Sequence, residues 1–129
     1  MPQAASIEVA VVDDQNSTRT LVRQSLQHLG FRRIVEFENG AVARDYLQTK
    51  KVHLIFSDLN MPELDGLGLL RAVRSHPATS KTAFIMLTGR ADSNLVQEAV
   101  KLGVNNYIVK PFTIETLKKK VEAVLGPLT

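Results

Sequence analysis

The chain lacks cysteine and tryptophan, and aromatic residues make up only 5% of it. The lack of cysteine excludes disulfides, thiolate-metal centres and thiol redox chemistry. No apolar run approaches the roughly 18 residues of a transmembrane helix. Residues 1–6 also lack the basic and apolar regions of a signal peptide. We therefore expect a cytoplasmic protein that does not associate with a membrane.

The net charge is also small, at +3, and the charged residues are spread along the chain. The only basic run, Lys118-Lys119-Lys120, has no aromatic residues interleaved with it, so a solvent-exposed helix face explains it better than a nucleic-acid site. With 129 residues, 44% of them hydrophobic, the chain is long enough for one domain with its own core. We place that domain at residues 1–129 and its core at about 7–125.

Five short apolar runs alternate with five amphipathic segments. The predicted strands are Ile7–Val12, Ile34–Phe37, Leu54–Ser57, Ala83–Leu87 and Tyr107–Val109. The predicted helices carry these apolar residues at helical spacing: Leu21, Val22, Leu26 and Leu29; Val42, Ala43, Tyr46 and Leu47; Leu67, Leu70 and Val73; Leu95, Val96, Ala99 and Val100; Ile114, Leu117, Val121 and Val124. This alternation predicts a doubly wound α/β domain, with a mostly parallel sheet covered on both faces and right-handed crossovers.

The ends of two helices carry recognisable signals. Asn16 or Ser17 is available to cap the first helix, and Gly30 stands where its carboxyl end needs a glycine. The fourth helix should run from about Ser93 to Leu102, with its four apolar residues inward and Gly103 closing it.

Polar residues follow four of the five predicted strands: Asp13 and Asp14, Asp58, Thr88, and Lys110. In open α/β sheets, ligands bind outside the carboxyl ends of the strands. We therefore expect these side chains to share one edge of the sheet.

Three carboxylates at one edge call for a cation, because two like charges about 4 Å apart repel by roughly 4 kcal/mol at an effective dielectric constant of 20. Hard oxygen ligands without histidine or cysteine favour Mg²⁺. Lys110 and the hydroxyl of Thr88 could hold the oxygens of a transferring phosphoryl group. A carboxylate beside the metal, Asp58, could attack phosphorus and become an aspartyl phosphate.

Each of these residues also has a purely structural explanation. Asp13-Asp14 could simply start a loop and cap a helix, and Asp65-Gly66 is typical of a turn and cap. A Lys110–Pro111 bond would ordinarily be trans, since only about 5–6% of X–Pro bonds are cis. Surface or hydrogen-bonded positions are expected, rather than metal ligation, for His28, His53 and His76.

In combination, the motifs resemble the receiver domains of two-component response regulators, and specifically the single-domain, CheY-like chemotaxis type. The resemblance covers the chain from about Ile7 to Leu125. It implies a five-stranded parallel sheet of order 2-1-3-4-5, with two helices on one face and three on the other. The motifs that carry it are Val11-Val12-Asp13-Asp14, Ser57-Asp58-Leu59-Asn60-Met61-Pro62, Asp65-Gly66-Leu67, Leu87-Thr88-Gly89 and Tyr107-Ile108-Val109-Lys110-Pro111-Phe112.

The resemblance implies that Asp58 accepts a phosphoryl group from a histidine kinase, a phosphotransfer protein or a small donor such as acetyl phosphate. Asp14 and Asp58 would bind Mg²⁺ directly, together with the backbone carbonyl of Asn60, and Asp13 would act mainly through a bound water. The protein would be a signalling phosphoacceptor that catalyses transfer to its own aspartate and its slow dephosphorylation, rather than an enzyme that turns over a separate substrate.

The resemblance also implies a switch. Lys110, across a cis bond to Pro111, would pair with Asp58 and then with the phosphoryl group. Thr88 would bond the phosphoryl oxygen and draw its loop inward, and Tyr107 would move into the vacated space, with Gly89 leaving room.

That motion would alter the surface of the fourth helix, fifth strand and fifth helix, where output partners of the family bind. This surface would expose Lys101, Lys118 and Lys119, which suits an acidic or amphipathic partner such as a flagellar switch protein; an ordinary solvated helix face explains these lysines equally well. We expect a monomer. Asn60 matches the chemotaxis type, whereas Arg90, two residues after Thr88, does not, so the phosphate lifetime cannot be carried over.

Other interpretations of the sequence remain open. The chain could be a receiver cut from a larger regulator with a DNA-binding output, or a regulator of another phosphorelay, although Met1 and a complete last helix favour a stand-alone protein. A metal-dependent phosphatase would need an acid where Asn60 stands. A flavodoxin-like cofactor binder would need a Ser/Thr/Gly phosphate cradle where residues 13–16 read Asp-Asp-Gln-Asn.

Overall fold

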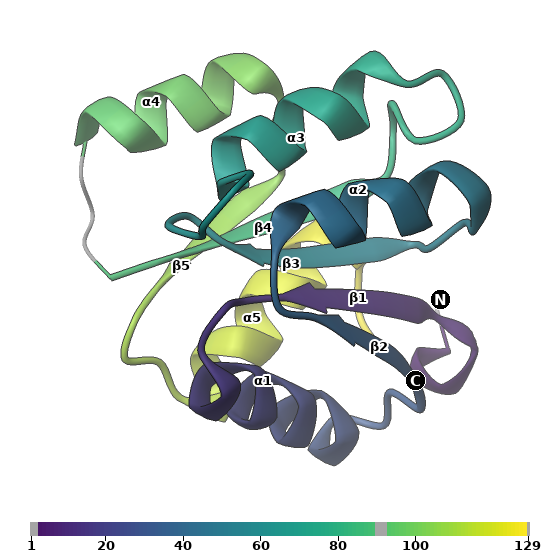
Figure 1. Cartoon of the computed structure of the whole chain (residues 1–129). Coiled ribbons are helices and arrows are strands. Elements are labelled where there is room, and N and C mark those ends of the chain that lie inside the picture. Colours follow the sequence, from purple (N-terminus) through teal and green to yellow (C-terminus); the bar gives the residue numbers. More distant parts are fainter. Residues whose placement is uncertain (1–2, 90–92, 129) are drawn as a thin grey trace.

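The computed structural model describes residues 3–89 and 93–128, which form a five-stranded parallel sheet with helices on both faces (Figure 1). The strand order is β2-β1-β3-β4-β5, as the resemblance implied. The strands are β1 (Glu8–Val12), β2 (Arg33–Phe37), β3 (Leu54–Asp58), β4 (Ala83–Thr88) and β5 (Asn106–Val109). The helices are a short 3-10 turn η1 (Ala4–Ser6), α1 (Asn16–His28), α2 (Gly40–Thr49), α3 (Gly66–Ser75), α4 (Ser93–Leu102) and α5 (Ile114–Leu125).

The sheet separates two hydrophobic cores. Helices α1 and α5 cover one face, and α2, α3 and α4 cover the other (Figure 1). Along β1 the side chains alternate between them: Val9 and Val11 belong to the α1/α5 core, and Ala10 and Val12 to the α2/α3/α4 core. All four are fully buried. Burial on both faces explains why the central strands are continuous apolar runs.

The predicted strands agree with the observed ones to within one residue at each end. Two of the extensions matter, because Asp58 and Thr88 prove to be the last residues of β3 and β4 rather than loop residues. Asp58 pairs with Leu87 in the sheet register, and Thr88 pairs with Val109. Their backbones are therefore fixed by the sheet.

Two predictions about helices were wrong. Neither Asn16 nor Ser17 caps α1: the helix begins at Asn16, the cap position is Gln15, and no side chain caps it. On α4, Ala99 is buried, but Val100 is 60% exposed. The glycine signals were right, since Gly30 and Gly103 adopt φ values of 102° and 94° directly after α1 and α4. Among the described residues, no helix is both long and apolar enough to cross a bilayer.

Candidate metal centre

Three carboxylates meet at the carboxyl ends of β1 and β3. Each of Asp13, Asp14 and Asp58 offers an oxygen, and these oxygens lie within 4.8 Å of one another. They meet because β1 and β3 are neighbours in register, with Val12 opposite Ser57. Asp13 and Asp58 are buried, whereas Asp14 is exposed and faces solvent. The predicted cluster is therefore confirmed as a geometric fact.

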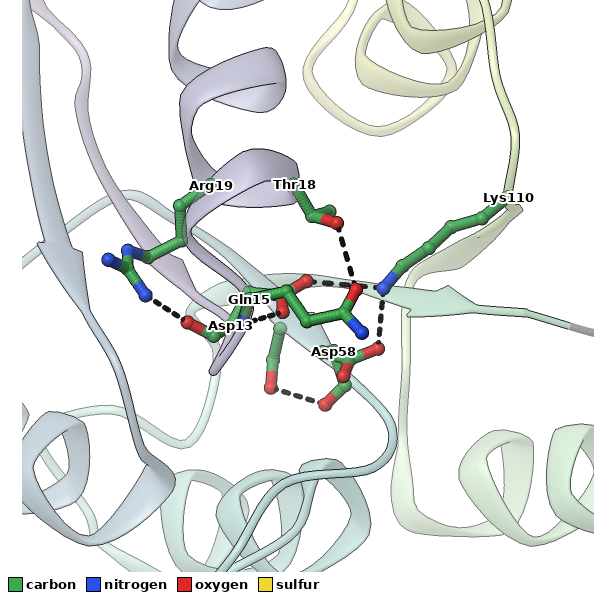
Figure 2. A network of polar contacts seen from close by, with 7 residues as sticks. Asp13, Gln15, Thr18, Arg19, Asp58 and Lys110 are labelled. Atoms are coloured by element: carbon green, nitrogen blue, oxygen red, sulfur yellow. Dashed lines mark hydrogen bonds and ion pairs between the residues drawn. The ribbon is translucent and has the colours of Figure 1, made fainter.

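Lys110 bridges the two buried carboxylates (Figure 2). Its Nζ lies 2.9 Å from Asp58 Oδ1 and 3.2 Å from Asp13 Oδ2. Its backbone N–H donates to the carbonyl of Thr88 at 2.7 Å, which ties the end of β5 to β4. The Lys110–Pro111 peptide bond is cis, as the resemblance implied.

The electrostatics of the carboxylate cluster favour a cation in addition to the ammonium of Lys110. Burial raises the pKa of Asp58, and the charges of Asp13 and Asp14 add to this effect, while the hydrogen bond from Lys110 opposes it. Burial alone would lower the pKa of Lys110, yet its hydrogen bond to Asp58 and the charges of Asp13 and Asp58 outweigh this and raise that pKa. The carboxylate is thus destabilised even with the lysine in place.

The donor set fits a hard divalent cation. All ligands at the edge are oxygens, and Asp14 and Asn60 are exposed, so they leave an approach open from solvent. Mg²⁺ keeps several waters and takes one or two carboxylates, which this half-open arrangement allows. The buried Ser57 hydroxyl donates its hydrogen to the backbone carbonyl of Asp58 at 3.0 Å, so this hydrogen is not available to the carboxylate cluster.

Gly66 sets the path of the loop that follows Asp58. Its N–H donates to the carbonyl of Leu59 at 2.9 Å, bringing the start of α3 against the end of β3. A Cβ at this position would collide with the carbonyl of Asp58 and would lie 2.7 Å from Met86 Sδ and 2.9 Å from Leu59 Cα. The preceding Asp65 caps α3 by accepting from Gly68 N at 2.8 Å, as predicted. The sequence did not reveal that Gly66 lies against the backbone of Asp58.

The residues of the expected switch lie beside the cluster. Thr88 is buried at the end of β4, a Cβ added at Gly89 would meet no atom within 4 Å, and Tyr107 is half-buried on β5. The ring of Tyr107 lies under Lys120, with Nζ 5.0 Å from its centroid. A small apolar pocket is lined by Leu59, Met86, Thr88, Leu95, Val96, Ala99, Val104 and Tyr107. Arg90 lies outside the described residues.

The histidines stand apart from the cluster, as expected. His28 is exposed. His53 Nδ1 accepts from the backbone N–H of Glu8 at 2.9 Å, and His76 Nδ1 accepts from that of Ala78 at 3.2 Å. His53 and His76 thus accept hydrogen bonds from the backbone, and no histidine belongs to the carboxylate cluster found among the described residues.

The carboxylates at the ends of β1 and β3, the bridging Lys110 and the buried Thr88 can now be compared with known proteins. The response regulator receiver domain family matches residues 9–122. The chain belongs to this family.

The relatives of this receiver include chemotaxis proteins. It is 46% identical over 128 residues to the probable chemotaxis protein CheY of Rhizobium etli, covering 99% of both chains. The structure of the chemotaxis protein CheY4 of Vibrio cholerae is 33% identical, with a TM-score of 0.85 over 92% of this chain and 98% of that one. The receiver domain of a Pseudomonas aeruginosa sensor histidine kinase, described with a magnesium ion coordinated in its active site cleft, is 25% identical, with a TM-score of 0.85 over 94% and 98%. The receiver is therefore CheY-like in sequence and fold.

Proposed function

We propose that the chain is a stand-alone response regulator that accepts a phosphoryl group on Asp58 in a Mg²⁺-dependent reaction. The observation that supports this most is the bridge from Lys110 to Asp58 and Asp13, with Asp14 open to solvent beside it. The carboxyl ends of β1, β3 and β5 thus bring a nucleophile, a candidate cation site and an ammonium into a single cluster.

In the reaction, an oxygen of Asp58 attacks the phosphorus of the donor. The bond from phosphorus to the donor breaks, and its electrons leave on the imidazole of a kinase or phosphotransfer protein, or on acetate when acetyl phosphate is the donor. Lys110 turns from Asp58 to the phosphoryl oxygens, and the hydroxyl of Thr88 donates to one of them. A magnesium ion held directly by Asp14, Asp58 and the carbonyl of Asn60, with Asp13 acting mainly through a bound water, would offset the negative charge on the phosphoryl oxygens.

The switch that follows uses Thr88, Gly89 and Tyr107. Thr88 moves toward the phosphoryl group, and Tyr107 turns from the surface into the space beside it, next to the apolar pocket that both residues already line. A Cβ added at Gly89 would have no neighbour within 4 Å, so the space beside this residue is open. Pro111 fixes the backbone that carries Lys110.

The output surface consists of α4, β5 and α5. Lys101, Lys118 and Lys119 are exposed on it, so it suits an acidic or amphipathic partner segment. The similarity to chemotaxis proteins named CheY supports a role in chemotaxis, with a histidine kinase as donor and a flagellar switch protein as output partner. We propose that the protein acts as a cytoplasmic monomer.

The decisive experiment is covalent labelling. The parent, incubated with acetyl phosphate and Mg²⁺, should gain the mass of one phosphoryl group, and Asp58→Asn should gain none while keeping its fold. Asp45→Asn removes the same charge from an exposed position on α2 and should label like the parent. Full labelling of Asp58→Asn on another residue would refute the proposal.

A further inference from the structure

Arg19 on α1 binds the loop that carries Asp13 and Asp14 (Figure 2). Its Nη1 donates to the carbonyl of Asp13 at 2.6 Å, the shortest of its contacts, and its Nη2 donates to Asn16 Oδ1 at 2.9 Å. Its Nε lies 3.6 Å from Glu36 Oε1 on β2, and its side chain is only 14% exposed. A single guanidinium therefore joins β2, the end of β1 and the start of α1.

The carbonyl that Arg19 holds belongs to the peptide unit between Asp13 and Asp14. The rest of Asp13 is held as well: its N–H donates to the carbonyl of Phe37 at 3.0 Å, Oδ1 accepts from Gln15 N at 2.8 Å, and Oδ2 accepts from Lys110. Arg19 supplies the remaining contact. Fixing this peptide plane sets the direction in which the Asp14 side chain leaves the backbone.

The cap residue of α1, Gln15, makes no side-chain capping hydrogen bond, so this common means of fixing the start of a helix is not used there. Nor is Arg19 needed to neutralise Glu36, because Arg23 Nη1 lies 2.8 Å from Glu36 Oε2. Among the described residues, Arg19 and not Arg23 donates to the Asp13 carbonyl.

We propose that Arg19 is a positioning residue for the cation site, which orients Asp13 and Asp14 through the peptide that joins them. The inference rests on the proposed Mg²⁺ site and adds a residue to it. Mg²⁺ requires near-ideal octahedral geometry, so an acidic pair that is free to turn binds it less tightly. Residues that orient ligands without touching the metal typically account for about 10–100-fold in metal affinity.

The test is the Mg²⁺ dissociation constant of the unphosphorylated full chain, measured by calorimetry for the parent, Arg19→Gln and Arg23→Gln. Arg23→Gln is the matched control, because it removes the same charge and a partner of the same Glu36 but leaves the Asp13 carbonyl held. We expect binding about tenfold weaker in Arg19→Gln, and within about twofold of the parent in Arg23→Gln. Coulomb's law alone predicts the opposite sign, since removing a positive charge near the site should tighten cation binding.

A folded Arg19→Gln that binds Mg²⁺ as tightly as the parent, or more tightly, overturns the proposal. Should that variant fail to fold, Arg19→Lys decides: it keeps the charge, but a lysine cannot reproduce the guanidinium fork. We expect weaker binding in Arg19→Lys as well, and parent-like affinity there would overturn the inference. A parent that binds no Mg²⁺ would instead remove the proposed cation site itself, so the two failures are distinguishable.

Discussion

Lys110 Nζ lies 2.9 Å from Asp58 Oδ1, although the two residues are 52 positions apart in the chain. The same ammonium reaches Asp13 Oδ2 at 3.2 Å, so one lysine holds together two buried carboxylates. It offsets only part of their charge, since the pKa of Asp58 is still raised, first by burial and then by Asp13. We expect both the stability of the protein without metal and its proposed response to phosphorylation to depend on this pair.

Lys110→Ala should destabilise the metal-free protein. Asp13 and Asp58 would keep their burial but lose their shared donor, and leaving a buried charged acceptor unsatisfied costs about 1–3 kcal/mol or more. Saturating Mg²⁺ should restore most of the loss, because the cation replaces the missing charge. Thermal unfolding with and without Mg²⁺ measures both effects. A loss that Mg²⁺ does not reduce would show that the lysine matters for packing and not for charge.

Asp58→Asn should have the opposite effect and raise the melting temperature of the metal-free protein at neutral pH. The variant loses a hydrogen-bonded charge pair with Lys110, but it also loses the burial of a charge and its repulsion from Asp13 and Asp14, which dominate. Each kcal/mol relieved raises the melting temperature by about 4 °C in a domain of this size.

The rise in melting temperature expected for metal-free Asp58→Asn should depend on pH in a defined direction. Because the folded pKa of Asp58 is raised, its carboxyl stabilises the fold below its ordinary pKa of about 3.9 and loses that contribution as pH rises through the folded pKa. The difference in melting temperature between variant and parent should therefore be smallest in acid and grow with pH. If the metal-free parent proved more stable than Asp58→Asn at neutral pH, repulsion of Asp58 by Asp13 and Asp14 could not be the dominant effect.

Gly66→Ala should destabilise the fold and disturb the cluster. The added Cβ would collide with the carbonyl of Asp58, and overpacking of this kind costs about 1–3 kcal/mol. Gly89→Ala is the control, because a Cβ there meets nothing within 4 Å. Urea unfolding should separate the two variants, and equal stabilities would show that the backbone at Gly66 yields easily.

Tyr107 should become less accessible when Asp58 is phosphorylated. The chain has no tryptophan and two tyrosines, so Tyr46→Phe leaves Tyr107 as the only strong emitter. Iodide quenching of its fluorescence should fall after treatment with acetyl phosphate and Mg²⁺, because the ring turns inward from its place beneath Lys120. Unchanged quenching in a fully phosphorylated sample would argue against the switch.

The same probe tests whether Lys110 couples the site to the surface. We expect Lys110→Ala in the Tyr46→Phe background to accept some phosphate, as measured by intact mass, with no change in Tyr107 quenching. Asp58→Asn in the Tyr46→Phe background should accept no phosphate and show no change in Tyr107 quenching. A full quenching response in phosphorylated Lys110→Ala would show that Thr88 moves without the lysine.

The sheet and the site could be predicted because both depend on strands that are short, apolar and buried on both faces. Such strands have unambiguous ends, and in a parallel sheet all the carboxyl ends lie at one edge, so Asp13, Asp14, Asp58, Thr88 and Lys110 had to share it. The prediction that Val100 is buried failed because helical periodicity fixes which residues share a stripe but not how wide a stripe the sheet covers.

The sequence by itself determined the fold class, the strand order implied by the family resemblance, and the set of side chains at the cluster. Only the tertiary structure decided which atoms meet there: that Lys110 bridges two carboxylates, that Gly66 lies against the backbone of Asp58, and that Arg19 holds the Asp13 carbonyl. Periodicity and strand ends are properties of local sequence, and burial enforces them. Contacts between a side chain and a backbone carbonyl depend on loop dihedral angles, which are fixed only when β1, β2 and α1 have packed together.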